Sequence, residues 1–258
     1  MNWEYKKYMG FRITENGSLI LDHSINTYGN TCPSNNPTVT IKKVGEADFN
    51  VHSIFSRKFK APKNKRGDNC PFIYAYKGKE EGLNIGYRCA KDVMSATKEI
   101  LPKFFDELPH TYDLILSMPS KHNLVRLITR QVKLFHRNAA LDDNAFRKAT
   151  NADVLAEIDA SDLPYRTKSS IRRSVKKNAE DGQEFSIGNI GTGLRRHITP
   201  LFIDGVVNLD NIQRILLVDD LVSTGQTLVY ARQVLLGIKP ELDIEALALF
   251  GPFGGRFR

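Results

Sequence analysis

Two adjacent carboxylates, Asp219 and Asp220, follow an aliphatic run at residues 215–218, and a loop of small and hydroxyl-bearing residues follows them. Carboxylates accept hydrogen bonds from sugar hydroxyls and bind hard cations. A helix that begins after a glycine-containing turn offers free backbone N–H groups to a phosphate. One short segment therefore has the chemistry to bind a phosphorylated sugar. Its loop residues are Ser223, Thr224, Gly225, Gln226 and Thr227.

The flanking residues predict the elements that position this segment. A continuous aliphatic run such as 215–218 is typical of a strand buried on both faces. Downstream, Leu228, Ala231, Val234 and Leu235 have helical spacing, and Gly237 is a candidate C-cap. In open α/β sheets, ligands bind beyond the carboxyl ends of the strands, which is where Asp219 and Asp220 are expected.

A second unit of the same kind lies upstream. Residues 112–117 predict a strand, a polar loop with Pro119, Ser120 and Lys121 follows, and residues 124–136 predict a helix. Two strand–loop–helix units favour an α/β fold with a parallel sheet and crossover helices. Residues 72–76 and 244–250 predict further strands, and residues 84–105 predict a helix.

The chain divides into two parts by composition. Residues 1–66 form a β-leaning, polar segment with candidate strands at 38–41 and 51–55, and residues 67–258 hold the α/β units. A basic, weakly apolar excursion at 140–200 interrupts those units and predicts a lid or flexible loop. A surface helical hairpin that binds nothing is the alternative. Within it, residues 184–187 predict a short strand.

The net charge is +8, from 37 Lys and Arg against 29 Asp and Glu, which favours polyanionic partners. Basic runs at 57–66 and 166–177 could contact nucleic acid or a protein, although such runs are more often solvated loops. The three cysteines and six histidines show no metal spacing or disulfide framework. No apolar run reaches membrane-spanning length and no signal peptide is evident, so we expect a cytoplasmic protein.

Residues 216–228, with the sequence LLVDDLVSTGQTL, resemble the sugar-phosphate loop of the type I phosphoribosyltransferases. A second likeness is to the ComF-like branch of that family. It covers roughly residues 70–250 and includes the loop at 117–122 and the basic segment at 170–178. The branch's second proline in the first loop and its four-cysteine zinc site are absent here, and residues 1–66 match no family pattern.

The resemblance implies a type I phosphoribosyltransferase fold with an N-terminal hood, together with a role for each matched residue. Asp219 and Asp220 would accept hydrogen bonds from the ribose hydroxyls of 5-phosphoribosyl-1-pyrophosphate, and residues 223–227 would wrap its 5′-phosphate. The loop at Pro119, Ser120 and Lys121 would bind the diphosphate. A mobile lid carrying Arg172, Arg173 and Lys176 would close over it. Mg²⁺ would be held through the diphosphate, with no direct protein ligand.

The reaction implied is transfer of ribose 5-phosphate to an acceptor with release of pyrophosphate. An oxocarbenium-like state can be stabilised by electrostatics alone, so no covalent nucleophile is needed. In the alternative, the protein has the same fold but catalyses no reaction. It would then be a nucleotide-sensing or nucleic-acid-associated regulatory or effector protein, for example an accessory subunit in a defence system. In either case we expect a homo-oligomer or a subunit of a complex. The acceptor is not indicated by the sequence.

Two other classes are disfavoured. A response-regulator receiver domain also begins with an aliphatic strand and two aspartates, but it needs more chain after Asp220 than is present here. A P-loop nucleotidase would require the pattern GxxxxGK[ST], which the sequence lacks.

Overall fold

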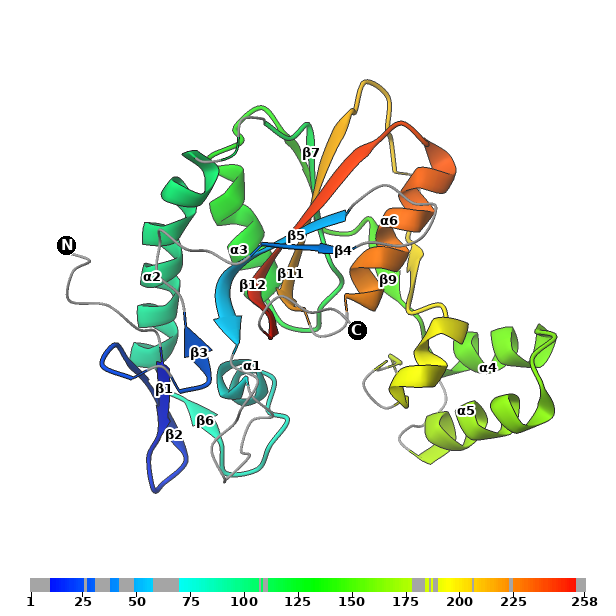
Figure 1. Cartoon of the computed structure of the whole chain (residues 1–258), viewed down its shortest axis with the longest axis horizontal. Coiled ribbons are helices and arrows are strands. Elements are labelled where there is room, and N and C mark those ends of the chain that lie inside the picture. The colour runs from blue at the N-terminus through cyan, green and yellow to red at the C-terminus, as the bar shows by residue number, and fades with distance from the viewer. Residues whose placement is uncertain are drawn as a thin grey trace.

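A parallel sheet of five strands forms the centre of the computed structural model (Figure 1). The structure describes residues 10–25, 27–30, 38–41, 49–57, 70–106, 108, 111–177, 184–185, 187, 190–205, 207–222 and 225–253. The parallel strands run in the order β5, β12, β11, β7, β8. Their bounds are Phe49–Arg57, Asp243–Phe253, Arg214–Leu221, Leu114–Ser117 and Ala140–Asp142.

The α/β class predicted from the sequence is confirmed by this sheet. The strands expected at 112–117, 215–218 and 244–250 correspond to β7, β11 and β12. All three are almost entirely buried at their centres, because helices cover both faces of the sheet.

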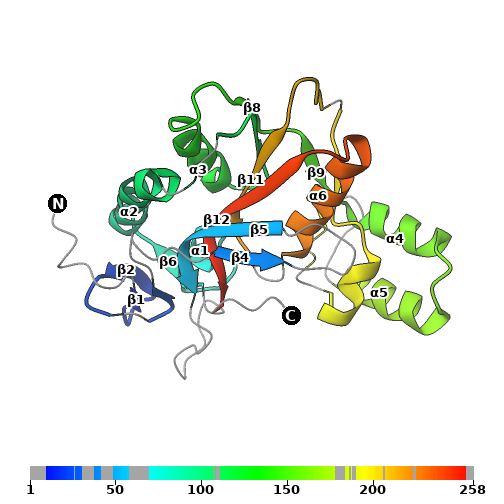
Figure 2. The ribbon, with the colours of Figure 1, turned by 45° about the horizontal axis from the view of Figure 1, so that its top comes forward.

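Alternate residues of β11 belong to two different cores. Leu216 and Val218 pack with α2 (Tyr87–Asp106) and α3 (Leu124–Lys133) on one face. Ile215 and Leu217 pack with α6 (Gln226–Ile238) on the other. Figure 2 shows the sheet between these helices. The alternation follows from the two-residue period of a strand, and it fixes the face to which each following side chain points.

Two local predictions are wrong. Residues 72–76 form the helix α1 (Pro71–Tyr76) and not a strand. Proline at the first helical position favours this outcome, because its fixed φ suits a helix and its missing N–H is not needed there. Gly237 does not follow α6 as a C-cap but lies inside its last turn, since the helix continues to Ile238.

The N-terminal segment contributes to two sheets. Strands β1 (Gly10–Ile13), β2 (Ser18–Asp22) and β6 (Asn84–Ile85) form a small sheet. The strands expected at 38–41 and 51–55 are confirmed as β4 (Thr38–Ile41) and part of β5. β5 is parallel to β12, whereas β4 and β3 (Gly29–Asn30) pair with β5 in the antiparallel sense. The main sheet therefore includes chain from within residues 1–66.

The excursion after β8 forms a subdomain with its own small core. Strands β9 (Phe146–Lys148) and β10 (Leu201–Ile203) pair in the antiparallel sense and form its stem. Between them lie α4 (Asn151–Ala160), α5 (Tyr165–Lys177) and the 3-10 helix Thr192–His197. Thr150 begins α4 with a capping box to Asp153. Of the strand expected at 184–187, the structure shows a single bridge between Glu184 and Thr150.

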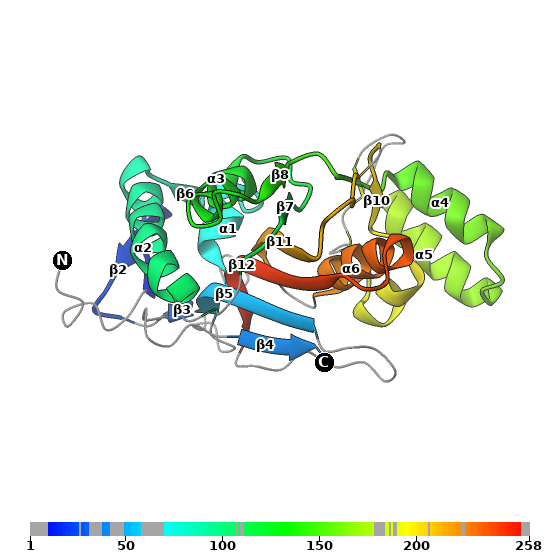
Figure 3. The ribbon, with the colours of Figure 1, turned by 90° about the horizontal axis from the view of Figure 1, so that it is seen from above.

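The three ribbon views agree on where this subdomain lies. In Figures 1 to 3, α4 and α5 lie at one end of the molecule, beyond α6, and α2 lies at the other end. Ile158 of α4 and Ile171 and Val175 of α5 are buried in the subdomain's core. The helices therefore pack against each other and not on the main sheet.

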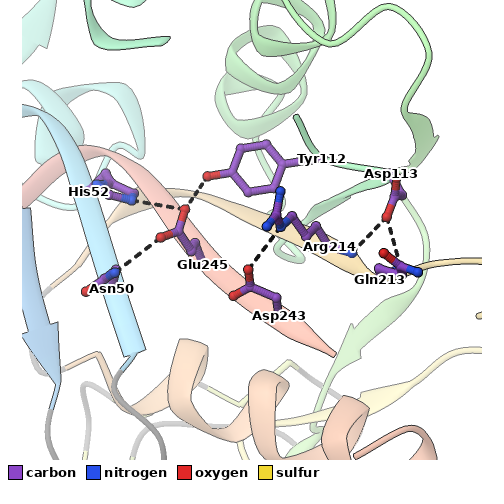
Figure 4. Close-up of polar contacts among 8 residues, drawn as sticks. All are labelled: Asn50, His52, Tyr112, Asp113, Gln213, Arg214, Asp243 and Glu245. Carbon is purple, nitrogen blue, oxygen red and sulfur yellow. Dashed lines mark hydrogen bonds and ion pairs between the residues drawn. The ribbon is translucent and has the colours of Figure 1, made fainter. Parts of the chain in front are cut away.

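A polar network crosses the amino-terminal part of the sheet (Figure 4). Glu245 of β12 accepts hydrogen bonds from Asn50 (3.2 Å) and Tyr112, and its Oε2 lies 3.4 Å from Nε2 of His52. Burial opposes ionisation of Glu245, but its contacts with His52 and Tyr112 lower its pKa overall. Nearby, Arg214 pairs with Asp243 at 3.1 Å. These contacts join β5, β7, β11 and β12 at the end of the sheet opposite to Asp219.

No helix within the described ranges is long and apolar enough to span a membrane.

Candidate phosphate-binding cleft

Two adjoining cavities, each of about 270 Å³, open where β7 and β11 end. Both are lined by Lys77, Lys79, Ile187 and Thr227, so they form one continuous cleft. The chain leaving β7 is held against β11, since the N–H of Met118 donates to the carbonyl of Val218 at 2.8 Å. The cleft is thus at the carboxyl edge of the parallel sheet, where α/β proteins bind ligands.

The two carboxylates point to opposite faces of β11, as the strand's alternation requires. Asp219 lines the second cavity and is part-buried. Its Oδ1 accepts a hydrogen bond from the N–H of Asp220 at 2.8 Å. Asp220 is only 3% exposed, and its Oδ2 lies 2.5 Å from Nζ of Lys77. One carboxylate therefore faces the cavity, and the other connects β11 to the turn after α1.

Burial, and next the charge of Asp220, raise the pKa of Asp219 to about 7, while Lys77 opposes that shift. Near neutral pH, a cation or a hydroxyl donor placed beside this carboxyl therefore stabilises its ionised form. A sugar hydroxyl or a divalent cation supplies such a group.

The start of α6 has the geometry of a phosphate cradle. Gly225 is the N-cap in the left-handed conformation, with φ 70°, and no side chain caps the helix. Among the described residues, the first backbone N–H groups of α6 therefore have no intrahelical or side-chain partner, and they carry the positive end of the helix dipole. Gly225, Gln226 and Thr227 line the second cavity. Ser223 and Thr224 lie outside the described residues.

The loop after β7 forms part of the first cavity, through Pro119, Ser120 and Lys121. Glu184, from the subdomain, lies 3.8 Å from the ammonium of Lys121 and 3.5 Å from that of Lys148. The structure thus brings the expected diphosphate loop beside the expected sugar-phosphate loop, with a carboxylate already between two lysines of the first cavity.

Several cations of the cleft were not predicted from the sequence. Lys77 and Lys79 follow α1, Lys148 ends β9, and Arg195 comes from the 3-10 helix. Partial desolvation, followed by the charge of Lys77, lowers the pKa of Lys79. Lys77, Lys79 and Lys148 together add positive potential to the cleft. Such potential favours binding of an anion with several charges.

Arg57 also lines the second cavity, and its guanidinium has a structural role. It is buried and donates to the carbonyls of Val222 (2.6 Å) and Gly251 (2.7 Å). These hydrogen bonds hold the chain leaving β11 against the end of β12. Arg57 is the one member of the basic run at 57–66 that the structure describes, and the others lie outside the described residues.

The predicted lid residues lie elsewhere. Arg172, Arg173 and Lys176 are on α5, and none of them lines either cavity. Arg172 instead pairs with Asp159 of α4. The subdomain contributes other residues to the cleft, namely Glu184, Phe185, Ile187, Arg195 and Pro200. Closure of α5 over a ligand stays a prediction.

The side chains of the cleft fit a magnesium ion only if a bound ligand supplies most of the oxygen atoms that coordinate the ion. In the described part of the chain, no three or more His, Cys, Asp or Glu side chains gather in a way that could hold a metal. Asp219 is the carboxylate in the second cavity, and Asp220 is engaged by Lys77. Mg²⁺ prefers few carboxylates plus phosphate oxygens, so this arrangement suits a cation brought in by a diphosphate.

In comparisons with known proteins, no family model and no curated protein sequence matches this chain.

Proposed function

We propose that the protein is a phosphoribosyltransferase of the type I fold, which binds 5-phosphoribosyl-1-pyrophosphate with Mg²⁺ and transfers ribose 5-phosphate to an acceptor. The observation that carries the proposal is the cleft itself. It joins an uncapped helix start, a carboxylate and at least three lysines at the ends of β7 and β11.

Each part of the cleft fits one part of this substrate. The N–H groups at the start of α6 suit the 5′-phosphate. Asp219 suits the ribose hydroxyls, and its charge opposes the positive charge that develops on the ring as the C1–O bond breaks. Lys121 and Lys148 suit the diphosphate, whose negative charge grows as it leaves. In this arrangement diphosphate binding displaces Glu184 from the two lysines.

Mg²⁺, when bound, would neutralise diphosphate charge and help it leave. Asp219 is the residue placed to contact it or its water. Phe185 and Ile187 are apolar residues from the subdomain that line the cleft, and they would limit water around the reacting carbon. Exclusion of water favours capture of the cationic ring by the acceptor over hydrolysis.

A second candidate is a binding protein without turnover, acting as a nucleotide-sensing or nucleic-acid-associated regulator or effector. The ion pair between Asp220 and Lys77 favours it, because it leaves a single carboxylate facing the cavity. Such a protein would bind the phosphorylated sugar or a nucleotide and release no pyrophosphate.

The test is incubation with labelled phosphoribosyl pyrophosphate, Mg²⁺ and pooled acceptors, namely bases, nucleotides, nucleic acid and protein. The labelled product is then identified and pyrophosphate is measured. Asp219→Asn should abolish release. Asp210→Asn changes an exposed carboxylate outside the cleft, so it should not affect release. Binding without release in the wild type would favour the second candidate, and absence of binding would reject the transferase proposal.

A further inference from the structure

The helix α5 carries a dense basic face that the cleft does not use. Its thirteen residues, YRTKSSIRRSVKK, include six Lys or Arg and no Asp or Glu. Ile171 and Val175 are buried against α4 and fix which face of the helix turns outward. The opposite face carries Tyr165, Ser169, Arg173 and Lys176 as one stripe, because residues three, four and eleven apart lie on the same side of a helix.

Five of the six basic side chains of α5 lie within the described part of the structure, and they fall into two groups. Arg172 and Lys168 are bound to α4, through the Asp159 carboxylate (Arg172 Nε at 2.8 Å) and the Asp159 carbonyl (Lys168 Nζ at 3.2 Å). Arg166, Arg173 and Lys176 form no ion pair with any described residue, and all three are exposed. Three uncompensated cations thus project from a helix that is itself held firmly.

The aromatic residue of this face is unusually open to solvent. The side chain of Tyr165 is 78% exposed at the first turn of α5. The helix has no exposed aliphatic side chain beside it, because Ile171 and Val175 face α4. Protein interfaces have an apolar core, which a single ring does not supply, and a membrane-binding helix needs aliphatic residues to insert. Neither partner fits this face.

We propose that the outward face of α5 binds single-stranded nucleic acid, a role beyond the proposed transferase activity. Arg166, Arg173 and Lys176 contact successive phosphates over roughly 15 Å, the rise of ten helical residues. The ring of Tyr165 stacks on an unpaired base, a contact that duplexes do not offer. Ser169 lies between the cations and is small enough to let the strand approach the helix.

The position of the subdomain suits this role. α4 and α5 lie at one end of the molecule, away from the main sheet (Figure 3). None of the three cations lines the cleft. Asp219→Asn changes the cleft and leaves α5 unaltered, so it should remove sugar-phosphate binding without removing nucleic-acid binding.

The test is fluorescence anisotropy with labelled 20-nucleotide single strands of DNA and RNA over a range of salt concentrations. The variant Arg166→Gln/Arg173→Gln/Lys176→Gln should lose at least tenfold in affinity. Its log–log salt slope should fall by about two, since each phosphate contact on a single strand contributes about 0.7. Urea unfolding reports whether the variant is folded, and its midpoint should match that of the wild type.

The matched control removes the same charge from α2 at the other end of the molecule. Arg88→Gln/Lys91→Gln/Lys98→Gln changes three exposed side chains and should alter affinity less than twofold. Tyr165→Ala should weaken binding about tenfold and Tyr165→Phe should restore it, because stacking needs the ring and not the hydroxyl.

Four results would overturn the assignment. These are no binding of single strands by the wild type, equal losses in both triple variants, tighter binding of a duplex of the same sequence, and equally effective competition by polyglutamate. Failure of phosphoribosyl pyrophosphate binding in the wild type would reject the proposed function and leave this result unaffected.

Discussion

Replacement of Gly225 by valine should separate phosphate binding from folding. Gly225 has φ 70° at the start of α6, a conformation that costs a residue with a Cβ about 1 to 2 kcal/mol and a β-branched residue at least that much. If valine moves the backbone out of this conformation, the N–H groups of Gln226 and Thr227 no longer converge on a phosphate. Hydrogen bonds to a charged group contribute about 1.5 kcal/mol or more each. Loss of two costs about 3 kcal/mol, or roughly 150-fold in Kd.

The assay is calorimetric titration of Gly225→Val with phosphoribosyl pyrophosphate and Mg²⁺, beside urea unfolding. Gly205→Val is the matched control. Gly205 has φ +84°, is exposed, and has nothing within 4 Å of the position that a Cβ would occupy. Both variants should lose similar stability, but only Gly225→Val should lose binding. Unchanged binding in Gly225→Val would refute the role of this helix start. Equal loss in Gly205→Val would show that stability, and not the cradle, is responsible.

Three further predictions concern other parts of the structure. Lys77→Met should cost roughly 3 kcal/mol in urea unfolding, because it leaves the Asp220 carboxylate buried without its cation; the double variant with Asp220→Asn should recover most of it. The folded state holds a proton on Asp219 that the unfolded chain has released, so wild-type stability should fall between about pH 4 and 7 relative to Asp219→Asn. Parallel pH curves for the two proteins would contradict this. Tyr112→Phe should cost about 1.5 kcal/mol or more in stability, because the hydrogen bond to Glu245 is lost. It should leave sugar-phosphate binding unchanged. Weaker binding would mean that the two ends of the sheet are coupled.

The strongest sequence predictions were the elements with long apolar patterns. β11 and β12 were predicted because strands buried on both faces have continuous aliphatic runs in their sequence. Residues 72–76 were misassigned because a short apolar run fits a strand and a buried helix equally well. The N-terminal Pro71 was the signal that could have decided it. The strand at 51–55 was predicted, but the buried polar residues His52 and Ser53 interrupt its aliphatic pattern, so the sequence did not indicate that it belongs to the main sheet.

Only part of the site could be predicted from the sequence. Asp219 and Gly225 could be placed because they lie in one continuous segment next to a predicted strand. Lys77, Lys148 and Arg195 could not, because they come from separate parts of the chain that only the tertiary fold brings together. A lysine that ends a strand or follows a short helix has no local pattern to distinguish it from a solvated surface lysine.

The stem of the subdomain has a consequence for how the protein could change over evolution. Lys148 of β9 lies directly opposite Leu201 of β10, so the chain leaves and returns at points about 5 Å apart. A segment with adjacent ends and its own core can be lengthened, shortened or exchanged without disturbing the strand order of the main sheet. The subdomain thus behaves as an insertion, and its exchange for another module would also replace the wall of the cleft that Glu184, Phe185 and Arg195 supply.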